Sequence, residues 1–172
     1  IPHGNSVADG DLITIDIGLI YQGYHLDTTM SFVVGRSTPF LDTFLAVGQQ
    51  SLDKAIAATV AGNSVYDISF AMEKPLRRHG YAAVYQLTGH GVGEELHMDP
   101  AIPCIPQRQD KKKILQVGQT LAVENMYTAG DPELVVASDG WTYTTKDGSL
   151  SAMFEETVLV TQKEPEVLTK AI

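Results

Sequence analysis

The sequence predicts a mixed α+β fold in which most strands pair in antiparallel fashion. Two neighbouring segments, residues 10–20 and 24–34, are rich in Ile, Val, Thr and Tyr and are separated by Gln22-Gly23, which indicates a β-hairpin. Two helical patterns follow this hairpin, and three short strand patterns follow the helices. With 172 residues and no visible linker or repeat, the chain fits one domain.

The two helical patterns have recognisable ends. The first covers residues 41–61, is introduced by Pro39 and is closed by Gly62. The second covers residues 65–79, with a serine N-cap candidate before it and a glycine after it. Pro75 lies inside this second pattern, so we expect it to strain or kink the helix.

The second half of the chain predicts strands separated by irregular connections. Short strands are expected near residues 82–87, 119–128 and 151–161. The connections expected between them are a Pro-rich segment at residues 99–106, the basic run Lys111–Lys113 and a turn at Asp147-Gly148.

The bulk composition excludes several classes of protein. Hydrophobic residues make up 44% and charged residues 19%, as in globular domains, and the net charge is −9. This balance predicts no nucleic-acid recognition and no attraction to anionic membranes. No apolar stretch approaches the length of a membrane-spanning helix. The lone Cys104 cannot form an intramolecular disulfide and fits a reducing, cytoplasmic setting.

Four carboxylates and one imidazole stand in surroundings that do not suit ordinary surface residues. A charge within an apolar strand is costly unless it is paired or bound to a metal. Two divalent metal ions require a ligand set of this kind. The candidate metal ligands are Asp16, Asp27, His90, Glu124 and Glu155.

The spacing of the first candidates strengthens this hypothesis. Asp16 and Asp27 lie on opposite arms of the predicted hairpin, where cross-strand neighbours are about 4.5–5.5 Å apart at Cβ. Either aspartate alone could equally terminate a strand. A lone His90 is more often a core residue, but its flanking glycines permit close backbone approach and favour a site. His97, seven residues on, could instead be a surface histidine.

The strand patterns leave one choice open. Alternation places Glu155 on the same face as Thr157, and Glu156 on the opposite face with Phe154. Periodicity does not say which of these two glutamates points into a site.

Four segments resemble the consecutive site motifs of type I methionine aminopeptidases, which belong to the pita-bread metallopeptidases. The segments are DGDLITIDIGLIYQGYHLDTT, TGHGVGEELHMDP, LAVEN and DGWTYTTKDGSLSAMFEETVLVT. The resemblance implies a pita-bread (creatinase/aminopeptidase-like) fold, with a largely antiparallel sheet flanked by helices. It also implies that residues 1–172 form a single metallopeptidase catalytic domain that removes N-terminal methionine.

The resemblance assigns a role to each candidate ligand. It implies that Asp16 binds one metal ion and that Asp27 and Glu155 bridge both ions. It implies that His90 and Glu124 complete the other metal site. The resemblance thereby selects Glu155 over Glu156.

The resemblance also implies the groups that handle the substrate. His97 matches a histidine that contacts the substrate and its tetrahedral intermediate, and Glu124 is the expected proton shuttle, so both are catalytic candidates. Trp141 matches an aromatic residue of the methionine side-chain pocket, although it could equally be a core tryptophan. Two divalent ions are implied, with Co, Mn or Fe favoured by a ligand set of carboxylates and one imidazole.

Three departures from the family pattern stand out. Asn125 replaces a usual proline, and Glu156 replaces a usual histidine. Only Ile1-Pro2 remains of the motif HGIP, so we expect the chain to be truncated at its N-terminus and to lack a catalytic histidine. We therefore expect residues 1–172 alone to bind divalent metals but to have low activity.

The resemblance implies the substrates of the protein, and three alternative functions remain to be considered. The substrates would be N-termini of peptides and nascent chains near the ribosome, with no membrane involved and a monomeric full-length enzyme. A related Xaa-Pro aminopeptidase or prolidase commonly has a histidine four residues before the metal histidine, where this chain has Gln86. A catalytically silent pita-bread binding protein would be expected to lack ligands. A metal-dependent nuclease would be expected to carry basic residues near the ligands.

Overall fold

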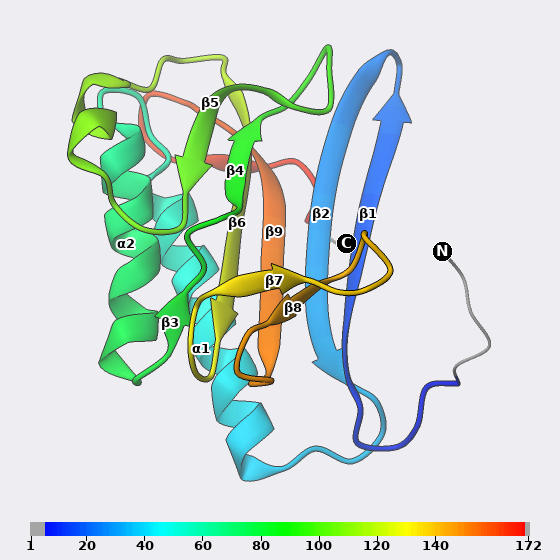
Figure 1. Cartoon of the computed structure of the whole chain (residues 1–172). Helices are drawn as coiled ribbons and strands as arrows, with labels where there is room; N and C mark the ends of the chain where they lie inside the picture. The colour runs from blue at the N-terminus through cyan, green and yellow to red at the C-terminus, as the bar shows by residue number, and fades with distance from the viewer. Residues whose placement is uncertain (1–5, 171–172) are drawn as a thin grey trace.

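The computed structural model describes residues 6–170 (Figure 1), so the Ile1-Pro2 remnant lies outside the described residues. The elements in chain order are β1 Leu12–Tyr21, β2 Tyr24–Val33, α1 Pro39–Ala58, α2 Val65–Arg78, β3 Ala82–Ala83, β4 Thr88–Gly91, β5 Met98–Pro103, the 3-10 helix η1 Arg108–Lys112, β6 Thr120–Thr128, β7 Leu134–Val136, β8 Tyr143–Thr145, β9 Ser151–Leu159 and β10 Glu166–Val167.

One antiparallel sheet organises the molecule and confirms the predicted α+β class. Its strand order is β1-β2-β9-β6-β4-β5, with β10 added to β9 and β3 added to β6. Helices α1 and α2 pack together on one side of this sheet, with α1 against β6 and β9 (Figure 1). The small β7-β8 hairpin crosses the other side. Strands from both ends of the chain therefore meet at the centre of the sheet.

The predicted hairpin is confirmed. Gln22 and Gly23 form its two-residue turn, with φ values of 51° and 88°. Positive φ at both central residues is the signature of a type I′ turn, whose twist matches that of the flanking strands. The turn therefore sets the register in which β1 pairs with β2 along its full length.

Both predicted helices form, with small shifts at their ends. Helix α1 begins at Pro39 because the Thr38 side chain accepts a hydrogen bond from the Leu41 backbone N–H. Helix α2 begins after a capping box in which Ser64 and Asp67 satisfy each other's backbone donors. Pro75 does not end α2, which continues to Arg78.

Two expectations for the middle of the chain were wrong. The strand near residues 82–87 shortens to β3, because the Gln86 side chain instead exchanges two hydrogen bonds with the Leu134 backbone, at 2.6 and 2.8 Å. The Pro-rich connection contains strand β5, which lies last in the sheet order. Proline lacks a backbone N–H and is tolerated in such an edge strand.

Besides the strands β4 and β10, two features were not predicted from the sequence, a 3-10 helix and a small hairpin. The basic run Lys111–Lys113 overlaps η1, which Asp110 stabilises through an ion pair to Lys113 at 2.8 Å. The segment before the Asp147-Gly148 turn contains the β7-β8 hairpin. Both elements depend on local turns and side-chain contacts, which strand and helix periodicity do not reveal.

The core lies between the helices and the central strands. Tyr127 packs against the Phe44 ring at 4.6 Å between centroids, and its hydroxyl donates to the Phe44 carbonyl at 2.8 Å. The buried Asn125 amide donates to the Gly48 carbonyl in α1 at 2.7 Å and accepts from the Phe154 N–H at 3.1 Å. Among the described residues, neither helix has the length and apolar character needed to cross a membrane.

Candidate metal centre

The candidate ligands come from five strands, β1, β2, β4, β6 and β9, and they share the face of the sheet opposite the helices. The strand registers place them in two adjacent rows. One row runs across the sheet through Asp16, Thr29, Glu155 and Glu124, and the other runs through Asp27, Thr157, Ala122 and His90. Residues two apart on a strand point to the same face, so both rows project their side chains into one space.

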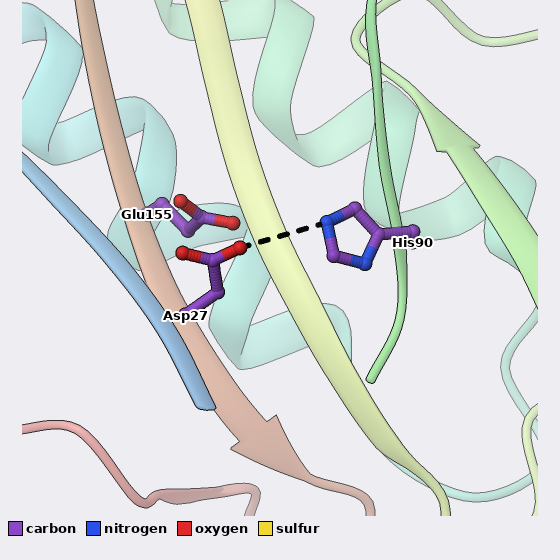
Figure 2. A group of neighbouring side chains, drawn as sticks. All are labelled: Asp27, His90 and Glu155. Atoms are coloured by element: carbon purple, nitrogen blue, oxygen red, sulfur yellow. Dashed lines mark ion pairs between the residues drawn. The ribbon is translucent and has the colours of Figure 1, made fainter. Parts of the chain in front are cut away.

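Three side chains converge most closely, as Figure 2 shows. Asp27, His90 and Glu155 are all buried, and each offers one ligand atom within 4.8 Å of the others. The His90 Nε2 atom lies 3.9 Å from a carboxylate oxygen of Asp27 and 3.9 Å from one of Glu124. These separations are too long for hydrogen bonds. They leave space that a shared cation can fill.

The imidazole of His90 is oriented by its own backbone surroundings. Its Nδ1 atom lies 2.9 Å from the Gly91 carbonyl oxygen, which favours a proton on Nδ1. The lone pair of Nε2 is then directed at the carboxylates. Metal-binding histidines commonly use the second ring nitrogen in this way.

One carboxylate oxygen of Glu155 has a hydrogen-bond partner, and the other has none among the described residues. Its Oε2 accepts a hydrogen bond of 2.7 Å from the Thr29 hydroxyl. Its Oε1 is buried and has no hydrogen-bond partner among the described residues. An unpaired buried carboxylate oxygen is costly. The arrangement therefore fits a metal ion, which would satisfy this oxygen.

The glycines around His90 allow β4 to lie very close to its neighbours. A Cβ atom on Gly89 would lie 2.5 Å from the Ala122 carbonyl oxygen, and one on Gly91 would lie 2.2 Å from the Asp99 carbonyl oxygen. Side chains at these two positions would push β4 away from β5 and β6. The TGHG segment thus brings the His90 ring within reach of Glu124.

The carboxylates of the centre resist ionisation in the metal-free protein. Burial, followed by the charges of Glu155, Asp27 and Asp16, raises the pKa of Glu124 to about 9. Burial raises the pKa of Glu155 to about 8, with the Thr29 hydrogen bond opposing this shift and Asp27 and Asp16 adding to it. Burial and the charge of Asp16 also raise the pKa of Asp27. A bound cation would compensate the repulsion among these groups.

The remaining candidates occupy different positions around a cavity of about 260 Å³. Asp16, Glu124 and His97 line it together with the three converging ligands. Asp16 is exposed and pairs with Thr29, so it lies diagonally from Asp27 and not directly opposite, as the hairpin geometry had suggested. The His97 ring lies 4.5 Å from the His90 ring, in an edge-to-face arrangement.

Two further residues considered in the sequence, Trp141 and Glu156, lie outside this cavity. Trp141 is 74% exposed beyond β7 and is not among the residues lining this cavity, so its assignment to a substrate pocket stays a prediction. Glu156 lies on the helix-facing side, where its carboxylate accepts a hydrogen bond from the Thr169 hydroxyl and lines a groove with Asp53 of α1.

Several residues that shape the site were not predicted from the sequence. Thr157 fixes the backbone of Asp27 through two hydrogen bonds of 2.8 Å, and Thr29 holds Glu155. Each threonine lies two residues after a carboxylate on the same strand face, and this spacing was the available signal. The apolar wall of the cavity, formed by Leu87, Met126 and Met153, carried no signal of its own in the sequence.

Comparison with known proteins places this geometry in context. Residues 1–162 match metallopeptidase family M24. The methionine aminopeptidase of Aquifex aeolicus is 36% identical over 165 residues, which cover 95% of this chain and 64% of that protein. The methionine aminopeptidase of Borreliella burgdorferi is 38% identical over 170 residues, which cover 99% of this chain and 68% of that protein. The chain thus spans about two thirds of the length of these relatives.

Solved structures share the fold and confirm the expected pita-bread architecture. The methionine aminopeptidase of Rickettsia prowazekii superposes with a TM-score of 0.93 at 32% identity, covering 99% of this chain and 68% of that one. The prolidase of Pyrococcus horikoshii superposes with a TM-score of 0.76 at 23% identity, covering 100% of this chain and 45% of that one. The prolidase likeness shows the fold alone.

Proposed function

The chain belongs to metallopeptidase family M24, and from this premise we propose that it is the catalytic domain of an aminopeptidase that removes N-terminal methionine. The observation that carries the proposal is the group formed by Asp27, His90 and Glu155, with an unsatisfied oxygen of Glu155 buried inside it. We propose that residues 1–172 act as one domain, because strands from both ends of the chain contribute ligands to a single sheet.

We propose that five side chains hold two divalent ions. Asp27 and Glu155 lie centrally and would be shared by both ions, while His90 and Glu124 would complete one site and the exposed Asp16 the other. A set of carboxylate oxygens with one imidazole suits Mn, Fe or Co. When bound, such ions would polarise the scissile carbonyl and activate water.

Two residues of the chain are placed to move protons and stabilise charge. Glu124 lies beside the converging ligands, with a carboxylate oxygen 3.9 Å from the His90 Nε2 atom, and this position suits a carboxylate that accepts and returns a proton. His97 lines the same cavity, with its ring 4.5 Å from the His90 ring. We assign it the role of donating a hydrogen bond to the oxygen of the substrate as negative charge develops.

The cavity also supports the choice of substrate. Leu87, Met126 and Met153 form an apolar wall beside the carboxylates, and Met126 and Met153 are paired across β6 and β9. An unbranched, apolar side chain such as that of methionine would fit against this flexible, thioether-lined wall. The free α-amino group of the substrate would then lie near the acidic end of the cavity. We retain Trp141 as a proposed contact to the substrate from the β7-β8 hairpin.

The cellular location of the proposed activity follows from its substrate. We infer that the substrates are N-termini of peptides and nascent chains, met near the ribosome in the cytoplasm. The only cysteine of the chain, Cys104, is buried as a free thiol, which fits a reducing compartment.

A proline-specific exopeptidase is the second candidate, because a prolidase shares the fold. One observation weighs against it. The position four residues before His90 is Gln86, whose side chain is engaged with the Leu134 backbone through two hydrogen bonds. Gln86 therefore cannot take the place of the histidine that proline-specific exopeptidases commonly have at this position. A catalytically silent binding protein is disfavoured because the carboxylates and His90 all gather in one place.

The test is the release of methionine from Met-Ala-Ser against the cleavage of an Xaa-Pro peptide, with and without added Mn²⁺. We expect slow release of methionine that requires the metal and is abolished by EDTA. The Glu155→Gln variant is the matched control for contaminating peptidases and should be inactive. Faster cleavage of the Xaa-Pro peptide, or release that EDTA leaves unchanged, would contradict the proposal.

A further inference from the structure

The two helices carry a groove that is separate from the candidate metal centre. The helices lie on one side of the sheet and the carboxylates lie on the other. It has a volume of about 500 Å³ and lies between α1 and α2. Its apolar floor includes Phe70 and Pro75 of α2. The metal centre does not use this groove, because its ligands project from the opposite face.

The charge of this groove is opposite to that of the whole chain. Lys54, Lys74 and Arg78 line it, and no carboxylate does, although the chain has 21 acidic and 12 basic residues. Among the described residues, none of these three cations forms a salt bridge. Unpaired cations gathered on one surface create a local positive potential that an overall negative charge does not cancel within a Debye length of about 8–10 Å.

Two aromatic rings of α2 lie beside these cations. The Tyr66 and Phe70 rings stack on successive turns of α2, with centroids 6.1 Å apart and planes 9° apart. The Lys111 ammonium lies 4.5 Å from the Tyr66 ring, and the Lys74 ammonium lies 5.9 Å from the Phe70 ring. Phe70 is 43% exposed despite its size. The α2 stripe, defined as Tyr66, Phe70, Lys74, Arg78 and Lys111, therefore combines two adjacent aromatic rings with positive charges at both of its ends.

We propose that the α2 stripe and the adjoining groove bind single-stranded nucleic acid. The exposed Phe70 ring offers a platform on which an unpaired base can stack, and neighbouring cations can contact the phosphates on either side of that base. From Tyr66 to Arg78 the helix rises about 18 Å, a length that accommodates a few nucleotides. An acidic peptide would use the cations but has no flat group that requires the stacked rings. The aromatic pair is thus the feature that selects nucleic acid.

The inference goes beyond the proposed peptidase activity and does not depend on it. It also revises the expectation drawn from net charge, because a bulk value of −9 averages over a surface whose basic residues are locally concentrated. A binding site on the helices would leave the metal centre, on the other face, accessible to a peptide.

The experiment measures the fluorescence anisotropy of a labelled oligouridylate 12-mer titrated with the purified chain at low salt. We expect Phe70→Ala to weaken binding by on the order of tenfold through lost stacking. We expect Lys74→Ala with Arg78→Ala to weaken binding further and to reduce the slope of log K against log salt by about 1.4, the value for two phosphate contacts on a single strand. Lys163→Ala with Lys170→Ala removes the same charge elsewhere and should change affinity less than twofold.

Three results would overturn the proposal. The first is no binding of the oligouridylate by the unaltered chain. The second is equal weakening by the control pair, which would mean diffuse electrostatic attraction. The third is displacement of the oligouridylate by poly-L-glutamate of equal charge at equal concentration, which would mark the groove as a site for acidic peptides. Since Phe70, Lys74 and Arg78 are exposed, the variants should keep the fold, and unchanged Mn²⁺ binding at the other face verifies this.

Discussion

Glu155 and Glu156 are neighbours in the chain but serve opposite faces of the sheet. Glu155 pairs across the strands with Glu124 and Thr29, in one of the two rows that form the candidate metal centre. Glu156 faces α1 and is held by Thr169. A charge-removing substitution that preserves shape should therefore have very different effects at these two positions.

The first prediction compares these two glutamates. Glu155→Gln should remove one proposed, charged metal ligand and should therefore weaken Mn²⁺ binding by at least about tenfold. Glu156→Gln should change Mn²⁺ affinity less than about threefold, because its carboxylate does not face the site. Isothermal titration calorimetry on both variants measures this. A larger loss in the Glu156 variant would show that the centre is wrongly assigned at this strand.

The second prediction concerns pH. Glu124 and Glu155 have pKa values raised to about 9 and about 8, whereas such carboxyls ordinarily titrate near 4.5. Between these values the folded, metal-free chain retains protons that the unfolded chain releases, so stability should fall as the pH rises from about 5 to about 8. The melting temperature of EDTA-treated protein across this range tests the sign.

Added Mn²⁺ should oppose this trend, because a cation binds the ionised carboxylates and its stabilising effect grows with pH. The double variant Glu124→Gln, Glu155→Gln should show a flatter pH dependence without metal. A metal-free melting temperature that increases across the same range would contradict the raised pKa values.

At the scale of elements, α1 is fitted closely to the central strands. A Cβ atom on Gly48 would lie 2.2 Å from the Tyr127 hydroxyl oxygen and 2.5 Å from the ring carbon that bears it. Gly48 also accepts the hydrogen bond from Asn125, the residue that follows the candidate ligand Glu124. The helix therefore supports the strand that carries this ligand.

The third prediction is that Gly48→Ala destabilises the protein by about 1–3 kcal/mol through overpacking. Helix propensity alone would give the opposite sign, a gain of up to about 1 kcal/mol. Urea denaturation measures the difference. Gln50→Ala, at an exposed position of the same helix, is the control and should stay within about 0.5 kcal/mol of the unaltered chain. Stabilisation by Gly48→Ala would show that α1 can move away from Tyr127 at no cost.

The elements that could be predicted from the sequence are those specified by local chemistry. The β1-β2 hairpin follows from the Gln22-Gly23 turn, and α2 follows from its Ser64 cap. Strand β5 contains Pro100 and Pro103, which suppress a strand signal, and only its place at the sheet edge makes it possible. The choice between Glu155 and Glu156 likewise depends on the register of β9 against β6, which is a tertiary property.

At the scale of the whole molecule, the β1 edge is the most exposed apolar feature of the sheet. Strand β1 is first in the sheet order, and only β2 pairs with it among the described residues. Ile15, Ile17 and Leu19 share one face of β1 and are 45%, 50% and 43% exposed. A long apolar edge strand with unpaired backbone groups is a template for pairing with another chain.

The fourth prediction is that residues 1–172 self-associate through this edge as concentration increases. Ile17→Lys should shift the population toward monomer, because a lysine on an edge strand opposes pairing. Size-exclusion chromatography with light scattering tests this between low and high micromolar concentrations. Val117→Lys places the same charge at another exposed aliphatic residue, which lies outside β1, and should leave association unchanged. Equal behaviour of the two variants would mean that association occurs elsewhere.

The alternation of faces along β6 and β9 restricts how this protein can diverge. One residue inserted between Phe154 and Glu155, with residues 151–154 kept in register, would move Glu155 into the position of Glu156 and turn it toward the helices. Both the core and the metal centre would be lost in one event, whereas substitutions affect one face at a time. Length variation among descendants of this sequence should therefore accumulate in connecting segments such as residues 137–142, and the strands should change only by replacement.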